Sequence, residues 1–229
     1  MKIYAFSFAS KKFISSQIKQ KESFIKAGFS SSDIFIYGPE QLEIDFYNNF
    51  PNASESNSFG WFSFKPYLLM KILSKINEGD LVFYLDVNDK PLIGVKEYLQ
   101  NKFKKNRFLD ILVPATNYPN INFLSKFHKR NFSFELLFSS LINMQPEAGA
   151  IIIKNSYKTK SIIKAWYFLT LLQANEFNKN NRERTRHDQE TLFIMSRIYN
   201  SIKLESWYKF KLTGQGLRNY IKFEYFRKN

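Results

Sequence analysis

The pattern of apolar and polar positions along the chain predicts alternating strands and helices. Residues 3–9 form an apolar and aromatic run typical of a strand. Residues 11–27 have a helical pattern that stops at Gly28, a natural helix C-cap. Three isoleucines recur there at near-helical spacing: Ile14, Ile18 and Ile25. Ile34–Tyr37 is a second short apolar run, closed by a Gly-Pro turn. This order of strand, helix and strand is typical of an α/β domain with a parallel sheet.

The next predicted elements are a loop, a helix and a buried strand. Residues 48–60 are polar and rich in turn-forming residues, which indicates a surface loop. Pro66 suits the first turn of a helix. Apolar residues form one stripe along that helix: Leu68, Leu69, Ile72, Leu73 and Ile76. Leu81–Leu85 is a continuous apolar run, the pattern of a strand buried on both faces.

The second half of the chain predicts two further strands and two further helices. Residues 109–114 and 148–153 are apolar runs typical of buried strands. Residues 156–177 and 187–199 carry apolar residues at helical intervals. Residues 116–145 give no clear pattern. We therefore expect an α/β fold with a mostly parallel sheet flanked by helices.

The composition of the chain indicates anionic partners and excludes several kinds of site. The chain of 229 residues carries a formal net charge of +14, which attracts polyanions and anionic membrane surfaces. It has no cysteine, which excludes disulfides, thiolate metal sites and a cysteine nucleophile. No run of about 18 apolar residues predicts a membrane span, and the N-terminal stretch is too short and too interrupted for a signal peptide. The phosphate-binding, dinucleotide-binding and serine-hydrolase glycine motifs are absent.

An acidic cluster follows the most apolar predicted strand. Asp86, Asn88 and Asp89 come directly after Leu81–Leu85. Ligands of α/β folds gather at the carboxyl ends of parallel strands, and these oxygens suit a hard divalent cation. The alternative is an exposed turn with no ligand, because Asp and Asn favour turns.

Four sequence elements give this cluster a context. They are W-x-x-x-K-P at 61–66, G-D-x-x-x-Y-x-D at 79–86, E-A-G at 147–149 and R-H-D-Q at 186–189. Together they resemble bacterial GT-A glycosyltransferases of the capsule and lipopolysaccharide type. The resemblance covers most of the chain, about residues 28–195.

The resemblance implies a GT-A-like, Rossmann-type sheet in one domain over residues 1–229. Residues 1–115 would form the nucleotide-sugar-binding half, and residues 116–229 the acceptor-binding half with a basic C-terminal tail. The implied activity is sugar transfer from a nucleotide-diphosphate sugar, foremost a UDP-sugar, to a hydroxyl of a surface glycan. Lipopolysaccharide, lipooligosaccharide and capsule are the implied acceptors. The implied location is the cytoplasm, with peripheral contact at the inner face of the membrane, and no nucleic-acid partner is expected.

The resemblance also implies roles for the donor-binding residues. Asp86, with Asn88 or Asp89, would hold Mn²⁺ or Mg²⁺ and the donor diphosphate. The family usually has Asp-Ala-Gly or a strict D-x-D here, so the uncharged Asn88 at the third position leaves metal dependence open. Lys65 would lie near the donor phosphates or ribose, and its alternative is a solvated lysine at a helix start. Trp61 would stack on a base or sugar, or else pack in the core.

Carboxylates from two other elements are candidates for catalysis. Glu147 or Asp188 could act as the general base that an inverting transfer requires, and retention or inversion stays open. His187 would contact metal or diphosphate, and Gln189 would orient the sugar. Asp188 has a structural alternative, because acidic residues stabilise helix N-termini.

Two basic segments suggest further contacts. Arginines in residues 182–186 could clamp an acidic acceptor, or could form a solvated loop. The tail, residues 209–229, interleaves cations with aromatic residues, which suits an anionic membrane surface as well as core packing. The rival functions are a basic nucleic-acid-binding protein and an inactive glycosyltransferase-like interaction protein.

Overall fold

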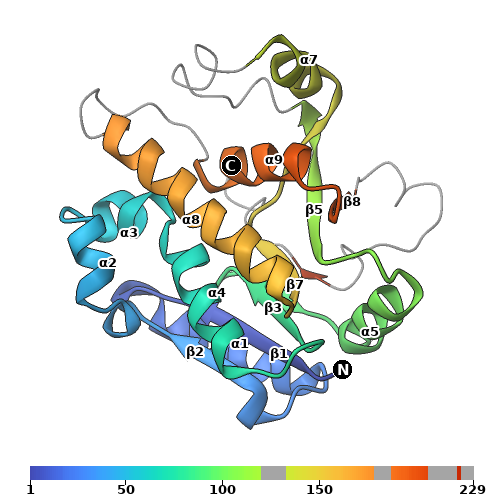
Figure 1. The fold of residues 1–229 in the computed structure, drawn as a ribbon. Helices are drawn as coiled ribbons and strands as arrows, with labels where there is room; N and C mark the ends of the chain where they lie inside the picture. Colours follow the sequence, from blue (N-terminus) through green and yellow to red (C-terminus); the bar gives the residue numbers. More distant parts are fainter. Residues whose placement is uncertain (120–132, 178–186, 206–220, 223–229) are drawn as a thin grey trace.

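A seven-stranded sheet forms the centre of the protein (Figure 1). The structure is a computed structural model that describes residues 1–119, 133–177, 187–205 and 221–222. The strand order is β2-β1-β3-β7-β5-β6, and β8 also pairs with β5. These strands are β1 (Ile3–Phe8), β2 (Ile34–Tyr37), β3 (Leu81–Leu85), β5 (Ile111–Pro119), β6 (Met144–Pro146), β7 (Ala150–Lys154) and β8 (Ile202–Glu205). A small second sheet pairs β4 (Lys90–Pro91) with β9 (Ile221–Lys222).

Most strands of the central sheet run in one direction. β1 is parallel to β2 and to β3, and β5 is parallel to β8. β7 is inserted antiparallel between β3 and β5, and β6 is antiparallel to β5. The predicted mostly parallel sheet is therefore confirmed. Because β7 is reversed, the residues that precede it lie at the same edge of the sheet as the residues that follow β1 and β3.

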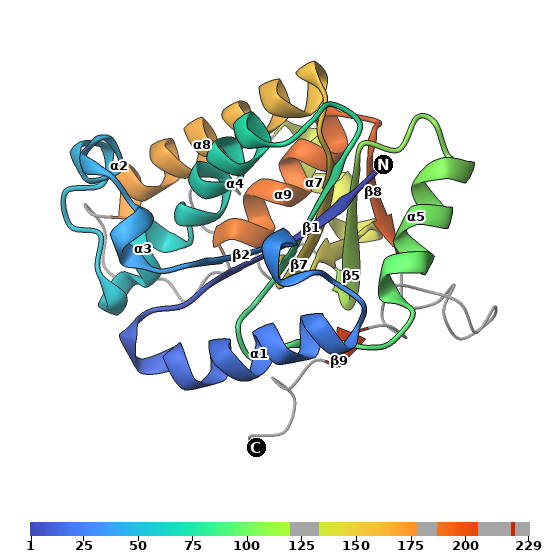
Figure 2. The same ribbon diagram turned by 90° about the horizontal axis from the view of Figure 1, so that it is seen from below.

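Helices cover both faces of the sheet (Figure 2). They are α1 (Ile14–Lys26), α2 (Ile44–Asn49), α3 (Ser58–Trp61), α4 (Phe64–Lys75), α5 (Val95–Lys105), α7 (Phe134–Ile142), α8 (Tyr157–Phe177) and α9 (His187–Ile198). Alternate residues of β3 divide between two cores. Val82 and Tyr84 belong to the core under α4, α8 and α9. Phe83 and Leu85 belong to the core under α1 and α5. The fully buried β3 thus has the continuous apolar sequence that its position requires.

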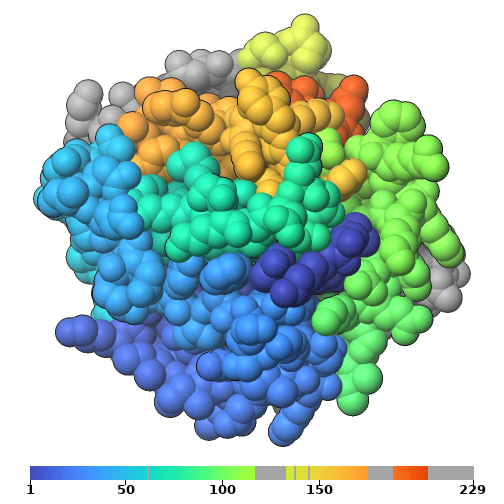
Figure 3. Space-filling view, turned by 60° about the horizontal axis from the view of Figure 1, so that its bottom comes forward, coloured from blue at the N-terminus to red at the C-terminus, as the bar shows by residue number. Residues whose placement is uncertain are grey.

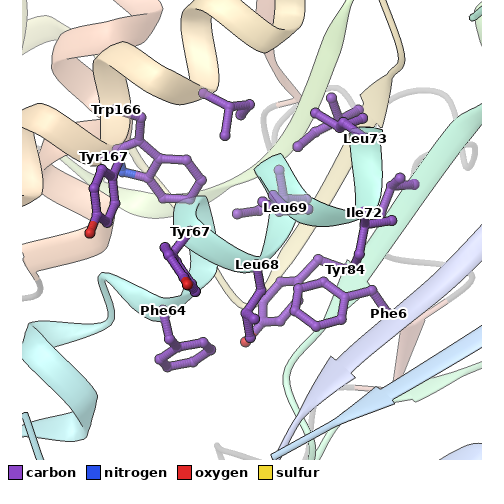
Figure 4. Close-up of a cluster of buried hydrophobic side chains, with 14 of the residues drawn as sticks. Phe6, Phe64, Tyr67, Leu68, Leu69, Ile72, Leu73, Tyr84, Trp166 and Tyr167 are labelled. Atoms are coloured by element: carbon purple, nitrogen blue, oxygen red, sulfur yellow. The ribbon is translucent and has the colours of Figure 1, made fainter. Parts of the chain in front are cut away.

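Helix α4 is the centre of the larger core (Figure 4). Its predicted stripe is buried, with Leu68, Leu69 and Ile72 fully inaccessible. On one side the helix faces Tyr84 of the sheet, and on the other it packs against α8, which contributes Trp166. The helix predicted from Pro66 onward is therefore confirmed, and its packing fixes the position of its first turn.

Helix α1 lies on the sheet with a largely polar face inward. Its buried residues are Gln17, Gln20 and Phe24. The isoleucines whose spacing indicated the helix are instead about half exposed: Ile14 50%, Ile18 57% and Ile25 47%. Strand carbonyls at this edge explain the orientation, because they need donors when they are buried. Gln17 Nε2 donates to the carbonyl oxygens of Tyr37 at 2.9 Å and Ser7 at 3.4 Å.

Some parts of the chain differ from the sequence prediction, and others lie outside the residues that the structure describes. Residues 48–60 were predicted as a loop, but they include a 3-10 turn and the short helix α3. Helix α5 and strand β8 were not predicted. The arginines of residues 182–186, and the aromatic residues of the tail, lie outside the described residues. Among the helices that the structure describes, none has the length and apolarity needed to cross a membrane.

The orientation of α1 can be tested by comparing two truncations. Phe24 is fully buried beneath α1, so we expect Phe24→Ala to lower the free energy of unfolding by about 3–5 kcal/mol. Ile18 faces outward, so Ile18→Ala should change it by no more than about 0.5 kcal/mol. Urea unfolding followed by circular dichroism measures both values. Similar losses for the two variants would contradict the observed orientation.

Candidate active site

A cavity of about 500 Å³ opens where β1 and β3 end. Most of the residues predicted for the site line it: Lys65, Asp86, Asn88, Asp89, Glu147, Asp188 and Gln189. They come from α4, from the turn after β3, from the segment before β7 and from the start of α9. The side chains of Trp61 and His187 lie outside the described part of the structure. Segments far apart in the sequence therefore meet at one edge of the sheet.

Lys65 joins these segments. Its side chain is buried, and the residue is only 1% exposed. Its Nζ lies 2.5 Å from Asp188 Oδ2 and 3.4 Å from Asp86 Oδ1, and it donates to the carbonyl oxygen of Ala148 at 3.0 Å. The ring of Tyr84 lies beneath the ammonium, 5.2 Å from it. This environment excludes the alternative of a solvated lysine at a helix start.

The protonation of the cluster follows from its charges. Burial, the largest single influence, lowers the pKa of Lys65, but the carboxylates of Asp188 and Asp86 outweigh it. The pKa of Lys65 is consequently raised, and the ammonium is charged at neutral pH. Burial and the charge of Asp86 raise the pKa of Tyr84 well above its ordinary value. Tyr84 is therefore a hydroxyl donor, and it donates to Asp86 Oδ1 at 2.5 Å.

The second oxygen of Asp86 faces the backbone before β7. A Cβ placed on Gly149 would lie 3.2 Å from Asp86 Oδ2 and 3.3 Å from Asp89 Oδ2. Both carboxylates thus approach the same glycine, and a larger residue there would crowd them. The backbone is fixed as well, because Asp86 N donates to the Gly149 carbonyl oxygen at 2.7 Å.

Asp86 and Asp89 are also the residues that a divalent cation would require at this site. Within the described ranges, no group of three or more His, Cys, Asp or Glu side chains could hold a metal ion. Mg²⁺, however, is commonly bound by only one or two carboxylates together with substrate phosphates and water. Asp86 and Asp89 fit that more limited requirement, and Asn88 lines the same wall.

Gln20 is a contributor to the site that the sequence analysis missed. It is fully buried on α1, and its Nε2 donates to the carbonyl oxygens of Asp86 at 2.6 Å and Asp89 at 2.8 Å. It therefore holds the backbone of the turn that carries the acidic cluster. The available signal was the i, i+3 spacing of Gln17 and Gln20, which places two amides on one face of the helix.

A second part of the cavity wall, at residues 58–62, has a strained backbone. Ser58, Phe59 and Phe62 have φ values of 52°, 50° and 69°, and they are the only non-glycine residues with positive φ in the described chain. All three line the cavity. Gly60 lies between them with φ 69°, and a Cβ there would approach the ring of Phe50 to 2.9 Å. Strained residues persist where the surrounding packing determines them, and they concentrate at functional sites.

Asp188 is held by its own helix and by Lys65. Its Oδ1 accepts the backbone N–H of Gln189 at 3.0 Å, so it does stabilise the start of α9. Helix α9 is in turn fixed to α8, because Trp166 Nε1 donates to Thr191 Oγ1 at 2.8 Å. Glu147 also lines the cavity and is 9% exposed. Two buried carboxylates, from different elements, therefore line one cavity.

No protein family and no curated protein sequence matches the chain. Solved structures do resemble it. One is a glycosyltransferase involved in the glycosylation of the major capsid of PBCV-1, with 12% identity over 96% of this chain and 93% of that chain, and a TM-score of 0.53. Another is the apo form of mouse xyloside xylosyltransferase 1, with 8% identity over 90% of this chain and 85% of that chain, and a TM-score of 0.56. This likeness confirms the predicted GT-A-like fold.

The buried ion pairs of Lys65 should stabilise the fold in a pH-dependent way. Lys65→Met leaves Asp188 buried without its cation, and we expect a loss of about 3–5 kcal/mol in the free energy of unfolding. Because the folded-state pKa is raised, the contribution of Lys65 is complete at neutral pH. This stabilisation is lost only as the pH rises through the pKa of Lys65 in the folded protein, which lies above the ordinary lysine pKa of about 10.4.

Urea unfolding between neutral and strongly alkaline pH checks both statements. The wild type should lose stability in the alkaline range more steeply than Lys65→Met. The double variant Lys65→Met/Asp188→Asn should recover part of the loss, because it removes the uncompensated charge. A double variant no more stable than the single one would contradict this account.

Gly149→Ala should strain the acidic turn. The added methyl group crowds both carboxylates, and overpacking of this kind costs about 1–3 kcal/mol. Removing one carboxylate with Asp89→Ala should reduce the cost of the same change without abolishing it, because the contact with Asp86 Oδ2 remains. A double-mutant cycle on thermal unfolding measures this coupling. Additive effects of the two substitutions would show that Gly149 is not required for the approach of Asp89.

Proposed function

We propose that the protein is a glycosyltransferase that uses a nucleotide-sugar donor. The observation that carries the proposal is the cluster of Lys65, Asp86 and Asp188 in a cavity at the carboxyl edge of a glycosyltransferase fold. The sequence elements that resemble capsule and lipopolysaccharide enzymes favour a UDP-sugar as the donor. They favour a hydroxyl of a surface glycan or a lipid-linked glycan as the acceptor.

The acidic turn would receive the donor diphosphate. Asp86 and Asp89 would hold Mn²⁺ or Mg²⁺, with the Asn88 carbonyl as a further oxygen ligand. Such an ion supplies neutralisation of the charge that develops on a departing diphosphate. Gln20 and Gly149 would keep the turn in the geometry that this binding requires.

Lys65 would act mainly on the position of Asp86. Its Nζ is surrounded by Asp188, Asp86 and the Ala148 carbonyl oxygen, and together these use the donors of an ammonium group. Its positive charge still lies at the wall of the cavity, where it would favour a diphosphate. The donor-binding roles predicted for Trp61, His187 and Gln189 remain part of the proposal.

Glu147 and Asp188 are both candidates for the general base that an inverting transfer requires. Both oxygens of Asp188 are engaged, one by Lys65 and one by the Gln189 amide. Glu147 lines the same cavity from the segment before β7, where its backbone N–H is held by the Pro114 carbonyl oxygen at 2.7 Å.

Nucleotide binding tests the proposal. The purified chain is heated with UDP-, GDP- and CMP-sugars, each with and without Mn²⁺ or Mg²⁺. A ligand at about 100 times its dissociation constant should add about 2.7 kcal/mol of stability. We expect one nucleotide class to stabilise the protein, metal to increase the effect and Asp86→Ala to abolish it.

A matched substitution controls for loss of charge. Glu78 is exposed and lies outside the cavity, so Glu78→Ala should bind the nucleotide as the wild type does. Stabilisation without any effect of metal would retain the transferase and remove the cation from the proposal. If no nucleotide stabilises the protein, and single-stranded nucleic acid binds in a salt-sensitive way, the proposal is wrong.

A further inference from the structure

The outward face of α1 carries an apolar stripe that no described residue covers. Ile14, Ile18 and Ile25 lie within about 40° of one another around the helix at 100° per residue. Each is about half exposed, and Figure 3 shows this blue segment at the surface of the lower part of the molecule. The inward positions of the same helix are occupied by Gln17, Gln20 and Phe24, so rotation of the helix cannot bury the stripe.

The segment that carries this stripe is positively charged. It contains five lysines of η1 (Lys11–Phe13) and α1: Lys11, Lys12, Lys19, Lys21 and Lys26. Glu22 is the only acidic residue in the same segment. Among the ion pairs of the described chain, none involves these lysines. The surface formed by the isoleucines and lysines, here the α1 face, is therefore amphipathic and cationic.

The α1 face adjoins the cavity. Lys12 and Phe13 of η1 line the cavity wall, and Ile14 follows them directly. At the next turns of the helix, Gln20 holds the acidic turn from the inner side. Helix α1 thus presents one side to the site and the opposite side to the exterior (Figure 2).

We propose that the α1 face docks the protein on an anionic lipid membrane. An apolar stripe on a lysine-rich helix matches the boundary between lipid headgroups and acyl chains, where isoleucines enter and lysines contact anionic headgroups. A second copy of this chain is a poorer occupant, because it would bring the same lysines together in a protein of net charge +14. Docking would place the mouth of the cavity next to the membrane, where a lipid-linked acceptor of the proposed transferase is held.

Vesicle flotation of the full chain tests the proposal. One set of vesicles contains equal parts of phosphatidylglycerol and phosphatidylethanolamine, and the other contains phosphatidylcholine alone. We expect binding to the anionic vesicles, weakened by added salt, and little binding to the neutral ones. The triple variant Ile14→Ser/Ile18→Ser/Ile25→Ser should lose at least about tenfold in binding, and Leu at the same positions should preserve it.

Apolar residues on other helices that are at least as exposed provide the control. The triple variant Ile44→Ser/Leu172→Ser/Ile198→Ser removes comparable apolar surface from α2, α8 and α9 and should bind vesicles like the wild type. Nucleotide-induced stabilisation should be unchanged in all variants, which separates membrane docking from the proposed activity. The proposal is overturned if the wild type does not bind anionic vesicles, or if the α1 variant binds them as well as the wild type does. It is also overturned if that variant converts a dimer to a monomer in light scattering, since the face would then join two copies.

Discussion

The charge of Lys65 is buried, and a buried charge is stable only where opposite charges and hydrogen-bond acceptors surround it. Here Asp86, Asp188 and the carbonyl oxygen of Ala148 meet that requirement. They come from the turn after β3, from α9 and from the segment before β7, so one ammonium group links elements distributed over most of the sequence. The apolar packing of α4 places the lysine at this point, and the ion pairs then determine how α9 and the acidic turn approach it.

Two further contacts fix the acidic turn at the edge of the sheet. Gln20 supplies donors to the carbonyls of the acidic turn, and Gly149 leaves room for the carboxylates. The position of Gly149 depends on the reversed strand β7, which places it beside the end of β3. The buried glutamines also explain why the isoleucines of α1 are exposed, because a helix that must supply amide donors to the sheet turns its apolar residues outward.

Much of this arrangement could be predicted from the sequence. The predicted apolar runs coincide with strands β2 and β3. The ordered motifs identified Lys65, Asp86, Glu147 and Asp188 as site residues, and all four line one cavity. The inward face of α1 could not be predicted, because its choice depends on carbonyl groups of strands distant in sequence. Nor could the burial of Lys65, since its partner Asp188 lies far along the chain and no local pattern relates the two.

The strained wall at residues 58–62 has a consequence for affinity. Each left-handed residue that is not glycine costs about 1–2 kcal/mol, so the backbone alone disfavours this wall. Packing offsets the cost, as Phe59 lies edge-on to Phe8 with ring centroids 5.3 Å apart. The apparent affinity of any ligand that contacts the wall is its intrinsic affinity multiplied by the population of the formed wall. Phe50 packs behind Gly60 and is not among the residues that line the cavity, so a substitution there would change ligand affinity through the population of the formed wall.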